Sequence, residues 1–319
     1  MSYRRFALLA FSPLLFACSE QAPPSAATAP VPAAPIESLV SVDWLAEHLA
    51  DADLVVLDAT VMIEADGNGG MRPVSGRANY EAGHIKGARF ADLMGELSDA
   101  EQAIGFAVPA PEAFAAAMAR LGVGDNTRVV LYSANNPSWA ARVWWMLRWI
   151  GFDNAALLDG GLKAWTDSGR PLSAEMPLVA RGELTVKLRP ELIVNQDQVR
   201  AAIENQSATI IDALPESHYR GETAMYARPG HIKGAVNVPV FDLYTENGEF
   251  RSLDEQRTLF DTAAGDRMIT YCGGGIAASA EAFVLTRLGY DNVAVYTASL
   301  QEWTADPENP METSTAAGE

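Results

Sequence analysis

The chain has little of what builds cross-links, metal sites or basic surfaces. Its 319 residues include only two cysteines, Cys18 and Cys272, which excludes a disulfide framework. Its four histidines have no close spacing and predict no metal site. Lysine and arginine number 23 against 41 aspartates and glutamates, so the formal charge is −18. This acidity excludes the basic surface that binds nucleic acid, and an anionic substrate would need a local positive pocket.

The N-terminus predicts a targeting segment. Arg4 and Arg5 precede an apolar stretch, Phe6–Ala17, that is too short to span a bilayer comfortably. The stretch ends in Leu15-Phe16-Ala17-Cys18, which resembles the lipobox of bacterial lipoproteins. The resemblance implies removal of residues 1–17 and lipidation of the Cys18 sulfur. The alternative is an ordinary secretory signal with an incidental cysteine.

Residues 18–37 are rich in alanine and proline and predict an extended tether. Two or more acyl chains would hold the protein on a membrane durably. Ser19 after the lipidated cysteine is, by lipoprotein rules, more consistent with the outer than the inner membrane. We therefore expect a lipid-anchored protein of the bacterial cell envelope, at the outer membrane and facing the periplasm. Cys272 would then be the free thiol of the mature protein.

An internal repeat predicts two domains. The hexapeptide Gly-His-Ile-Lys-Gly-Ala occurs at Gly83–Ala88 and again at Gly230–Ala235. Around each copy the same elements recur: a helix signal, a buried strand ending in aspartate, the hexapeptide, an amphipathic helix and a second apolar strand. Apolar strands that alternate with helices predict an α/β fold, with a mainly parallel sheet covered by helices on both faces. The predicted boundaries are an N-terminal domain over 38–170, a linker over 171–192, a C-terminal domain over 193–305 and a polar tail over 306–319.

Cys272 follows the apolar run Met268–Tyr271 and precedes a stretch that favours a helix from Gly275 or Ile276. The glycine-rich loop lets backbone N–H groups point inward, and the helix N-terminus adds partial positive charge. Such a site stabilises a thiolate and the anion with which it reacts. The residues expected to surround the sulfur and its substrate are Gly273, Gly274, Gly275, Ile276 and Ala277. A buried structural cysteine is the alternative, and the flanking glycines argue against it.

The first copy has no nucleophile at the matching place. There the chain reads Ser133–Trp139, without a thiol or a glycine run, and Pro137 removes one amide donor. The first domain is therefore expected to support the site and to form one of its walls.

Taken together, these motifs resemble the tandem rhodanese family of sulfurtransferases. The resemblance covers residues 41–303 and rests on both hexapeptides, Ala140–Arg148, Leu158–Trp165 and the cysteine loop. It implies two rhodanese-like domains, a site between them, and Cys272 of the second domain as a nucleophile that cycles through a persulfide. The expected reaction moves a sulfane sulfur from thiosulfate or 3-mercaptopyruvate to cyanide or a thiol, without a cofactor.

The sequence does not decide whether thiosulfate or 3-mercaptopyruvate is the sulfur donor. Glycine after the cysteine resembles the mercaptopyruvate subgroup, which usually has serine or threonine where this chain has Gly274. Arg220 and Arg228 are the candidates for clamping the donor, while His218 stands where the family has its first carboxylate-binding arginine. Asp212 is interpreted as an ordinary strand-end residue. The paired histidines of the hexapeptides are interpreted as turn-fixing.

Three other hypotheses compete. A dinucleotide site is one, since Gly273–Ala278 fits G-x-G-x-x-A, but the next strand, Asn292–Thr297, lacks the acidic residue that would hold a ribose. A cysteine phosphatase would need a bidentate arginine where Ala277–Ser279 stand. The third is a non-enzymatic one: an envelope-anchored persulfide carrier with little turnover of its own.

Overall fold

A computed structural model describes residues 35–263 and 265–314. The predicted signal peptide, Cys18 and most of the tether, up to residue 34, lie outside the described residues. Within the described part of the chain, no helix is long and apolar enough to cross a membrane.

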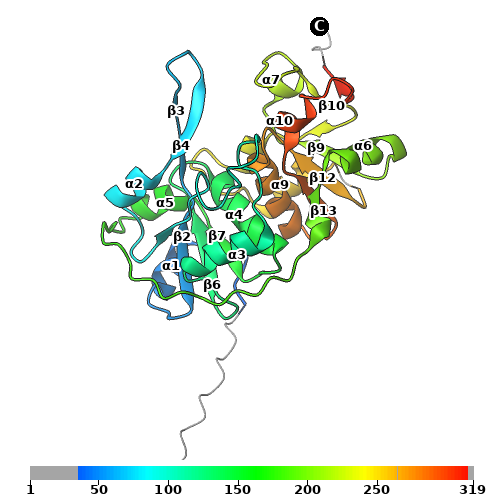
Figure 1. The fold of residues 1–319 in the computed structure, drawn as a ribbon. Helices are drawn as coiled ribbons and strands as arrows, with labels where there is room; N and C mark the ends of the chain where they lie inside the picture. Colours follow the sequence, from blue (N-terminus) through cyan, green and yellow to red (C-terminus); the bar gives the residue numbers. More distant parts are fainter. Residues whose placement is uncertain (1–34, 264, 315–319) are drawn as a thin grey trace, which may run out of the picture. The chain divides into compact units, whose positions relative to one another are not determined.

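The first domain is built on a five-stranded parallel sheet of order β1-β7-β6-β2-β5 (Figure 1). Its strands are β1 (Leu39–Val40), β2 (Leu54–Asp58), β5 (Arg89–Phe90), β6 (Arg128–Tyr132) and β7 (Ala155–Leu158). Its helices are α1 (Val42–His48), α2 (Arg77–Ala82), α3 (Pro111–Arg120), α4 (Pro137–Trp149) and α5 (Gly161–Asp167). An antiparallel hairpin, β3 (Val61–Ala65) and β4 (Met71–Ser75), projects beyond this sheet in Figure 1.

The second domain repeats this plan with a parallel sheet of order β11-β9-β12-β13-β8. Its strands are β8 (Ile193–Val194), β9 (Thr209–Asp212), β11 (Val236–Asn237), β12 (Met268–Tyr271) and β13 (Val293–Tyr296). Its helices are α6 (Gln196–Asn205), α7 (Glu216–Tyr219), α8 (Leu253–Leu259), α9 (Ile276–Arg287) and α10 (Ser299–Trp303), with 3-10 turns η1 (Pro190–Leu192) and η2 (Val240–Leu243). The prediction of two tandem α/β domains with mainly parallel sheets is confirmed.

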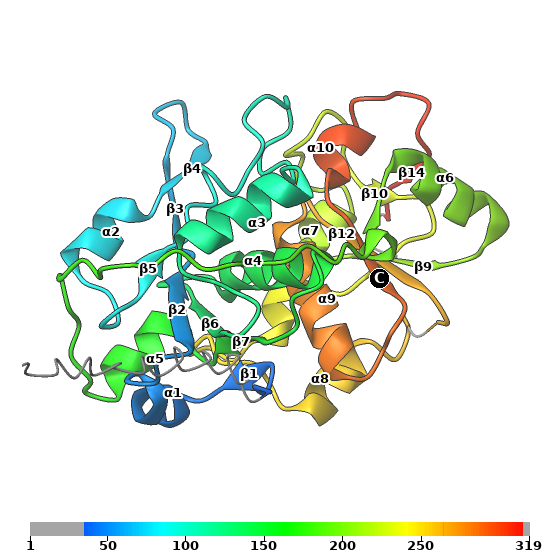
Figure 2. The same ribbon diagram turned by 60° about the horizontal axis from the view of Figure 1, so that its bottom comes forward.

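One hydrophobic core joins the two sheets. Successive side chains of a strand point to opposite faces, so Val55 and Leu57 of β2 enter one core while Val56 enters another. The core that contains Leu57 also contains Phe283 of α9 and Cys272. In Figure 2, α4 and α9 run side by side between the sheets. The second domain thus packs its cysteine-bearing face directly against the first.

The outer face of each sheet carries its own helices. In the first domain, Leu45 of α1 and Trp165 of α5 pack with strand residues in a separate core. In the second domain, Val199 of α6 and Trp303 of α10 do the same. Both sheets are therefore covered on both faces, as parallel sheets require.

Part of the segment predicted to be a polar tail instead folds onto the second domain. Met311–Glu312 forms strand β14, which pairs antiparallel with β10 (His231–Ile232) of the second hexapeptide. The prediction failed here because the segment has no apolar periodicity. It is held by backbone pairing and by hydrogen bonds to its carbonyl groups, which sequence patterns do not display.

Candidate active site

The sulfur of Cys272 lies at the end of β12 and at the start of α9. Strand β12 ends at Tyr271, and α9 begins at Ile276 with Gly275 as its N-cap residue. The N–H group of Gly275 donates a hydrogen bond to Sγ of Cys272, with 3.1 Å between nitrogen and sulfur. The sulfur therefore sits at the positive end of a twelve-residue helix, where backbone dipoles and an N–H donor favour negative charge.

The three glycines of the loop have different reasons to be glycine. Gly275 has φ 82°, a left-handed conformation that side chains rarely adopt. Gly273 and Gly274 do not have positive φ, but a Cβ at either position would displace a side chain that lies against it. A Cβ on Gly273 would lie 1.6 Å from the hydroxyl of Tyr226, and one on Gly274 would lie 2.3 Å from Nε2 of Gln301. Gly275 is therefore glycine because of its backbone conformation, and Gly273 and Gly274 because Tyr226 and Gln301 approach them closely.

The start of α10 holds the loop backbone from the opposite side. The hydroxyl of Ser299 accepts a hydrogen bond from the N–H of Cys272 at 3.0 Å and donates one to the carbonyl of Tyr296 at 2.7 Å. Ser299 itself has φ 52°, which is uncommon for a residue with a side chain. The N–H groups of Leu300 and Gln301 donate to the carbonyls of Cys272 and Gly273. These bonds fix the position of the cysteine before any substrate arrives.

A buried arginine of the first domain lies against the loop. Nη1 of Arg142, on α4, is 3.4 Å from the carbonyl oxygen of Gly275, and Nη2 donates to the carbonyl of Phe106 at 3.0 Å. The side chain is 1% exposed. Burial lowers the pKa of Arg142 to about 10, an effect that attraction by Cys272 opposes, so the guanidinium stays protonated at neutral pH. Its charge supports negative charge on the neighbouring sulfur.

Cys272 opens into a cavity of about 340 Å³ that both domains line. The first domain contributes Phe106 and Trp139, whose rings lie 5.3 Å apart. The second contributes Met225, Phe241 and the cysteine loop. Among the residues that the structure describes, every lining side chain is uncharged. The cavity is therefore a mainly apolar pocket with Cys272 among the residues that line it.

Two uncharged polar side chains stand over the loop. The hydroxyl of Tyr226 lies against Gly273, and burial, reinforced by the nearby Cys272 and Asp212, raises the pKa of this tyrosine, so it stays a neutral hydrogen-bond donor. The Gln301 side chain lies against Gly274, and its Oε1 accepts a hydrogen bond from the N–H of Gly105 at 2.8 Å. Gln301 thereby ties the cysteine loop to the first domain.

The predicted donor clamp is not formed by Arg220 and Arg228. The guanidinium of Arg220 pairs with Glu216 and, at 3.9 Å, with Glu222. That of Arg228 donates hydrogen bonds to five backbone carbonyls, which belong to Trp303, Thr304, Asp306, Pro307 and Asn309. Neither arginine lines the cavity at Cys272. Arg228 was misassigned because its partners lie about 75 to 81 residues further along the chain and bind through their backbones.

Four of the five loop residues predicted to surround the sulfur line the cavity: Gly273, Gly274, Ile276 and Ala277. The fifth, Gly275, donates a hydrogen bond to the sulfur. His218, which stands where the family has an arginine, lies on α7 and does not line the cavity. The sequence did not single out Arg142, Tyr226 or Gln301. Arg142 was visible only as part of a motif, and no local signal marks the other two.

Asp212 and the paired histidines have structural positions. Asp212 accepts hydrogen bonds from the Tyr271 hydroxyl at 2.6 Å and the Leu214 N–H at 2.8 Å, and burial raises its pKa to about 7. His84 stacks on Tyr80 and hydrogen-bonds its carbonyl, and His231 does the same with Tyr219. The equivalent geometry in both domains supports the turn-fixing interpretation.

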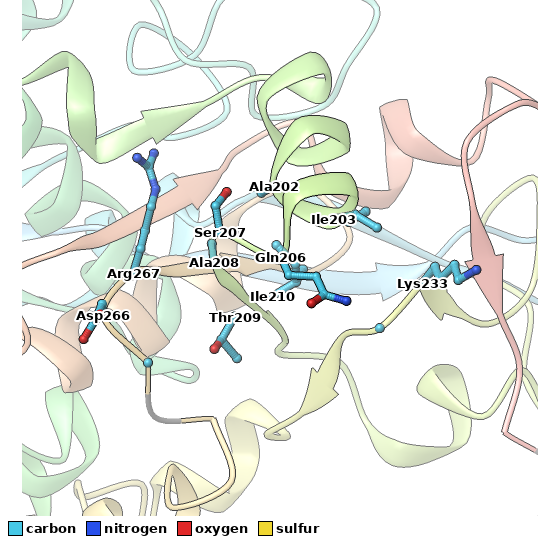
Figure 3. Close-up of a pocket in the computed structure, with 12 residues that line it drawn as sticks. Ala202, Ile203, Gln206, Ser207, Ala208, Thr209, Ile210, Lys233, Asp266 and Arg267 are labelled. Atoms are coloured by element: carbon cyan, nitrogen blue, oxygen red, sulfur yellow. The ribbon is translucent and has the colours of Figure 1, made fainter.

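A larger cavity of about 580 Å³ lies away from the cysteine, beside α6 and the first residues of β9 (Figure 3). Its two cationic side chains, Lys233 and Arg267, lie at opposite ends of it and do not converge. No group of three histidine, cysteine, aspartate or glutamate side chains that could hold a metal occurs in the described residues. The cavity at Cys272 is therefore the better candidate for chemistry.

Comparisons with known proteins agree with this geometry. Residues 41–168 and 195–306 match the family model of the rhodanese-like domain. The chain is 33% identical over 279 residues to 3-mercaptopyruvate sulfurtransferase of Escherichia coli (strain K12), covering 86% of this chain and 97% of that protein. It is 32% identical over 302 residues to thiosulfate/3-mercaptopyruvate sulfurtransferase 2 of Arabidopsis thaliana, covering 86% of each. The crystal structure of the 3-mercaptopyruvate sulfotransferase SseA from Escherichia coli matches with a TM-score of 0.73 and 34% identity, covering 83% of this chain and 99% of that one.

Proposed function

Because this chain belongs to the rhodanese family and is a sulfurtransferase of that type, we propose that Cys272 carries the transferred sulfur as a persulfide. The observation that supports this most directly is the 3.1 Å hydrogen bond from the Gly275 N–H to Sγ, at a helix N-terminus and beside a cavity that Cys272 lines. An N–H donor and a helix dipole stabilise a thiolate, which is the form of cysteine that attacks sulfur.

The first step loads the cysteine. With thiosulfate, the Cys272 thiolate attacks the sulfane sulfur, a new S–S bond forms, and the old S–S bond breaks as sulfite leaves with the electron pair. With 3-mercaptopyruvate, the thiolate attacks the donor sulfur and the C–S bond breaks as the S–S bond forms. The electron pair passes to the methylene carbon, which takes up the proton that the donor thiol gives up, and pyruvate leaves. Arg142 and the α9 N-terminus support the negative charge at the cysteine in both cases.

The second step removes the transferred sulfur from Cys272. A thiophilic acceptor, cyanide or a thiol, attacks the outer sulfur of the persulfide, and Cys272 leaves as a thiolate. Cyanide yields thiocyanate, and a thiol yields a new persulfide. The same backbone and Arg142 contacts that stabilise the attacking thiolate stabilise it again as the leaving group, so one arrangement serves both halves of the cycle.

The test is a donor–acceptor assay on residues 19–319 with mass spectrometry of Cys272. Thiosulfate or 3-mercaptopyruvate should add one sulfur atom, about 32 Da, to the Cys272 peptide, and cyanide should remove this added mass. Cys272→Ser should abolish both the mass change and the turnover. Sulfur transfer by Cys272→Ser would refute the role of Cys272. Stable loading without turnover for any small acceptor would favour the persulfide-carrier hypothesis.

We also propose that the protein is lipid-anchored in the bacterial cell envelope through Cys18. The charged n-region, the short apolar stretch and the cysteine at its end support this, together with the Ala/Pro-rich segment that follows. The full chain should partition into the detergent phase with a diacylated N-terminal peptide, whereas Cys18→Ala should not. A soluble full chain cleaved elsewhere would contradict the anchor without affecting the assay above.

A further inference from the structure

We propose that the linker between the two domains places an exposed apolar segment, Met176–Ala180, in the headgroup zone of the bilayer to which the chain is anchored. The inference rests on the proposed lipid anchor at Cys18 and adds the surface through which the folded domains contact the membrane. It follows from the exposure of this segment, from the way its two ends are fastened, and from the place where the described chain begins.

Met176–Ala180 is an unbroken run of five apolar residues on the surface of the first domain. Leu178 is fully exposed, and Met176 and Val179 are 53% and 36% exposed. Of the eleven large apolar side chains that are exposed in the described residues, five lie in this linker, so the exposure is concentrated there. A run of large apolar side chains left in water is unfavourable unless a partner buries it.

The linker is fastened on either side of this segment. Ser173 exchanges two backbone hydrogen bonds with His84, and the N–H of Gly182 donates to the carbonyl of Ala119 at 2.9 Å. Among the described residues, no hydrogen bond holds the backbone from Met176 to Arg181. Such a loop can enter the headgroup zone, where water still pairs its backbone groups, but not the hydrocarbon core, where unpaired groups are costly.

The described chain begins against the same linker. Pro35 lines a surface pocket together with Thr185 and Lys187. Residues 19–34 connect Pro35 to the proposed lipidated cysteine and can span at most about 60 Å. A second contact with the same bilayer is then effectively intramolecular, so even a weakly inserting segment should occupy the membrane surface.

The charges beside the segment favour lipid over a strongly charged partner. Glu175 and Arg181 flank the segment directly, and Glu183 and Lys187 follow. All four side chains are exposed, and none of them forms an ion pair with another described residue. Two acidic and two basic groups balance one another, so apolar contact should carry the binding, on zwitterionic lipid as well as on anionic lipid.

This orientation leaves the cavity at Cys272 in water. Ile63 and Pro73 of the hairpin β3–β4 line that cavity. In Figure 1 the hairpin projects at the top of the first domain, whereas the linker, in green, runs along its lower side. With the linker on the membrane, the sulfur donor and acceptor would therefore approach from the aqueous side.

The experiment holds residues 19–319 on vesicles without using Cys18. An N-terminal hexahistidine tag binds this chain to phosphatidylcholine vesicles that contain a nickel-chelating lipid. Leu178→Cys in a Cys272→Ser background provides a single thiol, which is labelled with the polarity-sensitive fluorophore NBD. Vesicles should raise the NBD emission about twofold or more, and a doxyl-labelled lipid should quench it, because the label leaves water for the headgroup zone.

Two further variants decide between lipid and other partners. Asn68→Cys, at the exposed tip of the hairpin, is the matched control, and its label should not respond to vesicles. Val179→Asp added to Leu178→Cys should remove most of the response, since a charge in the segment opposes insertion. Equal responses at positions 178 and 68 would overturn the inference. A response that needs no vesicles and grows with protein concentration would show that a second copy covers the segment, and would overturn it as well.

Failure of the anchor and failure of this inference give different results. A full chain that stays out of the detergent phase would refute the Cys18 anchor, which the tag replaces here. Absence of a Leu178 response on the vesicles would overturn the inference alone. Leu178→Asp should leave the kcat/KM of residues 19–319 for thiosulfate unchanged, because this side chain does not line the cavity at Cys272.

Discussion

Arg142 of the first domain and Gly275 of the second are in contact: Nη1 of the arginine lies 3.4 Å from the glycine carbonyl oxygen. Gly275 is also the residue whose N–H donates to Cys272. Gly275 therefore links the two side chains: its carbonyl oxygen contacts the Arg142 guanidinium, and its N–H group donates to the Cys272 sulfur. The domain without a nucleophile contributes a charge to the one that has it.

Replacement of Arg142 should slow loading of the cysteine. Arg142→Met removes the buried charge, so we expect the rate of Cys272 persulfide formation at neutral pH to fall at least tenfold, since charge stabilisation at a buried site is strong. Arg142→Lys should recover most of the rate, which a purely structural role would not predict. Arg148→Met is the control, because this arginine lies on the same helix but pairs with Asp153 at 3.9 Å and not with the cysteine loop. Rates per folded molecule that match wild type would exclude Arg142 as a positioning residue.

Gly274→Ser should disturb Gln301. The added Cβ would lie 2.3 Å from Nε2 of Gln301, so the amide must shift, and we expect its hydrogen bond to Gly105 to weaken. We expect a decrease in kcat/KM of about tenfold for every donor, because a shift of the loop misplaces the sulfur. The double variant Gly274→Ser/Gln301→Ala relieves the clash and should regain part of the rate. Equal kcat/KM values for the single and double variants would show that the Gln301 side chain moves aside without disturbing the loop.

Arg228 should matter for stability and not for donor binding. Its guanidinium satisfies five carbonyls between Trp303 and Asn309, beside the segment that forms β14. Arg228→Ala leaves those carbonyls without their donor, and we expect the free energy of unfolding to fall by about 1–3 kcal/mol. The KM of the folded variant for thiosulfate should be unchanged. A large rise in KM with unchanged unfolding would restore the donor-clamp assignment.

Asp212 should give the stability a pH dependence of defined sign. Its pKa is about 7 in the folded protein and near the ordinary 3.8 when unfolded, because burial disfavours the charged carboxylate. Between these values only the folded state keeps the proton. The protonated carboxyl of Asp212 therefore contributes fully to the free energy of unfolding below pH 3.8. Between pH 3.8 and pH 7 the free energy of unfolding falls by up to about 1.4 kcal/mol per pH unit. Above pH 7 the contribution is lost.

Urea unfolding of wild type and Asp212→Asn from pH 4.5 to 8 checks this. The asparagine cannot ionise, so the difference between the two proteins should shift in favour of the variant as pH rises. Asp66→Asn, at an exposed turn, serves as the control. Parallel profiles for wild type and Asp212→Asn would contradict the assignment.

What could be predicted from the sequence is what local patterns encode. The strand Met268–Tyr271, the helix from Ile276 and the cysteine between them follow from an apolar run, glycines and helix formers in adjacent positions. The repeat identified two equivalent domains because the hexapeptide builds the same turn twice. These features depend on residues within a few positions of one another.

What could not be predicted depends on distant partners. Gln301 reaches Gly105 across 196 positions, and Tyr226 covers Gly273 from a loop without regular structure. Arg228 looked available because its partners are backbone carbonyls, which every residue has. The type of residue predicts what chemistry is possible. The tertiary structure decides which arginine side chains are already paired with carboxylates or carbonyl groups and cannot bind a substrate.

The core shared by the two sheets has a consequence for the history of the chain. Once a duplicated pair of domains packs Phe283 of one copy into the same interior as Leu57 of the other, neither copy can accumulate substitutions on its inner face independently. The inner face of the first domain is therefore constrained although no thiol follows its strand β6, because α4 presents Arg142 to the cysteine loop. A substitution on that face would act on the chemistry of the second domain without touching its nucleophile.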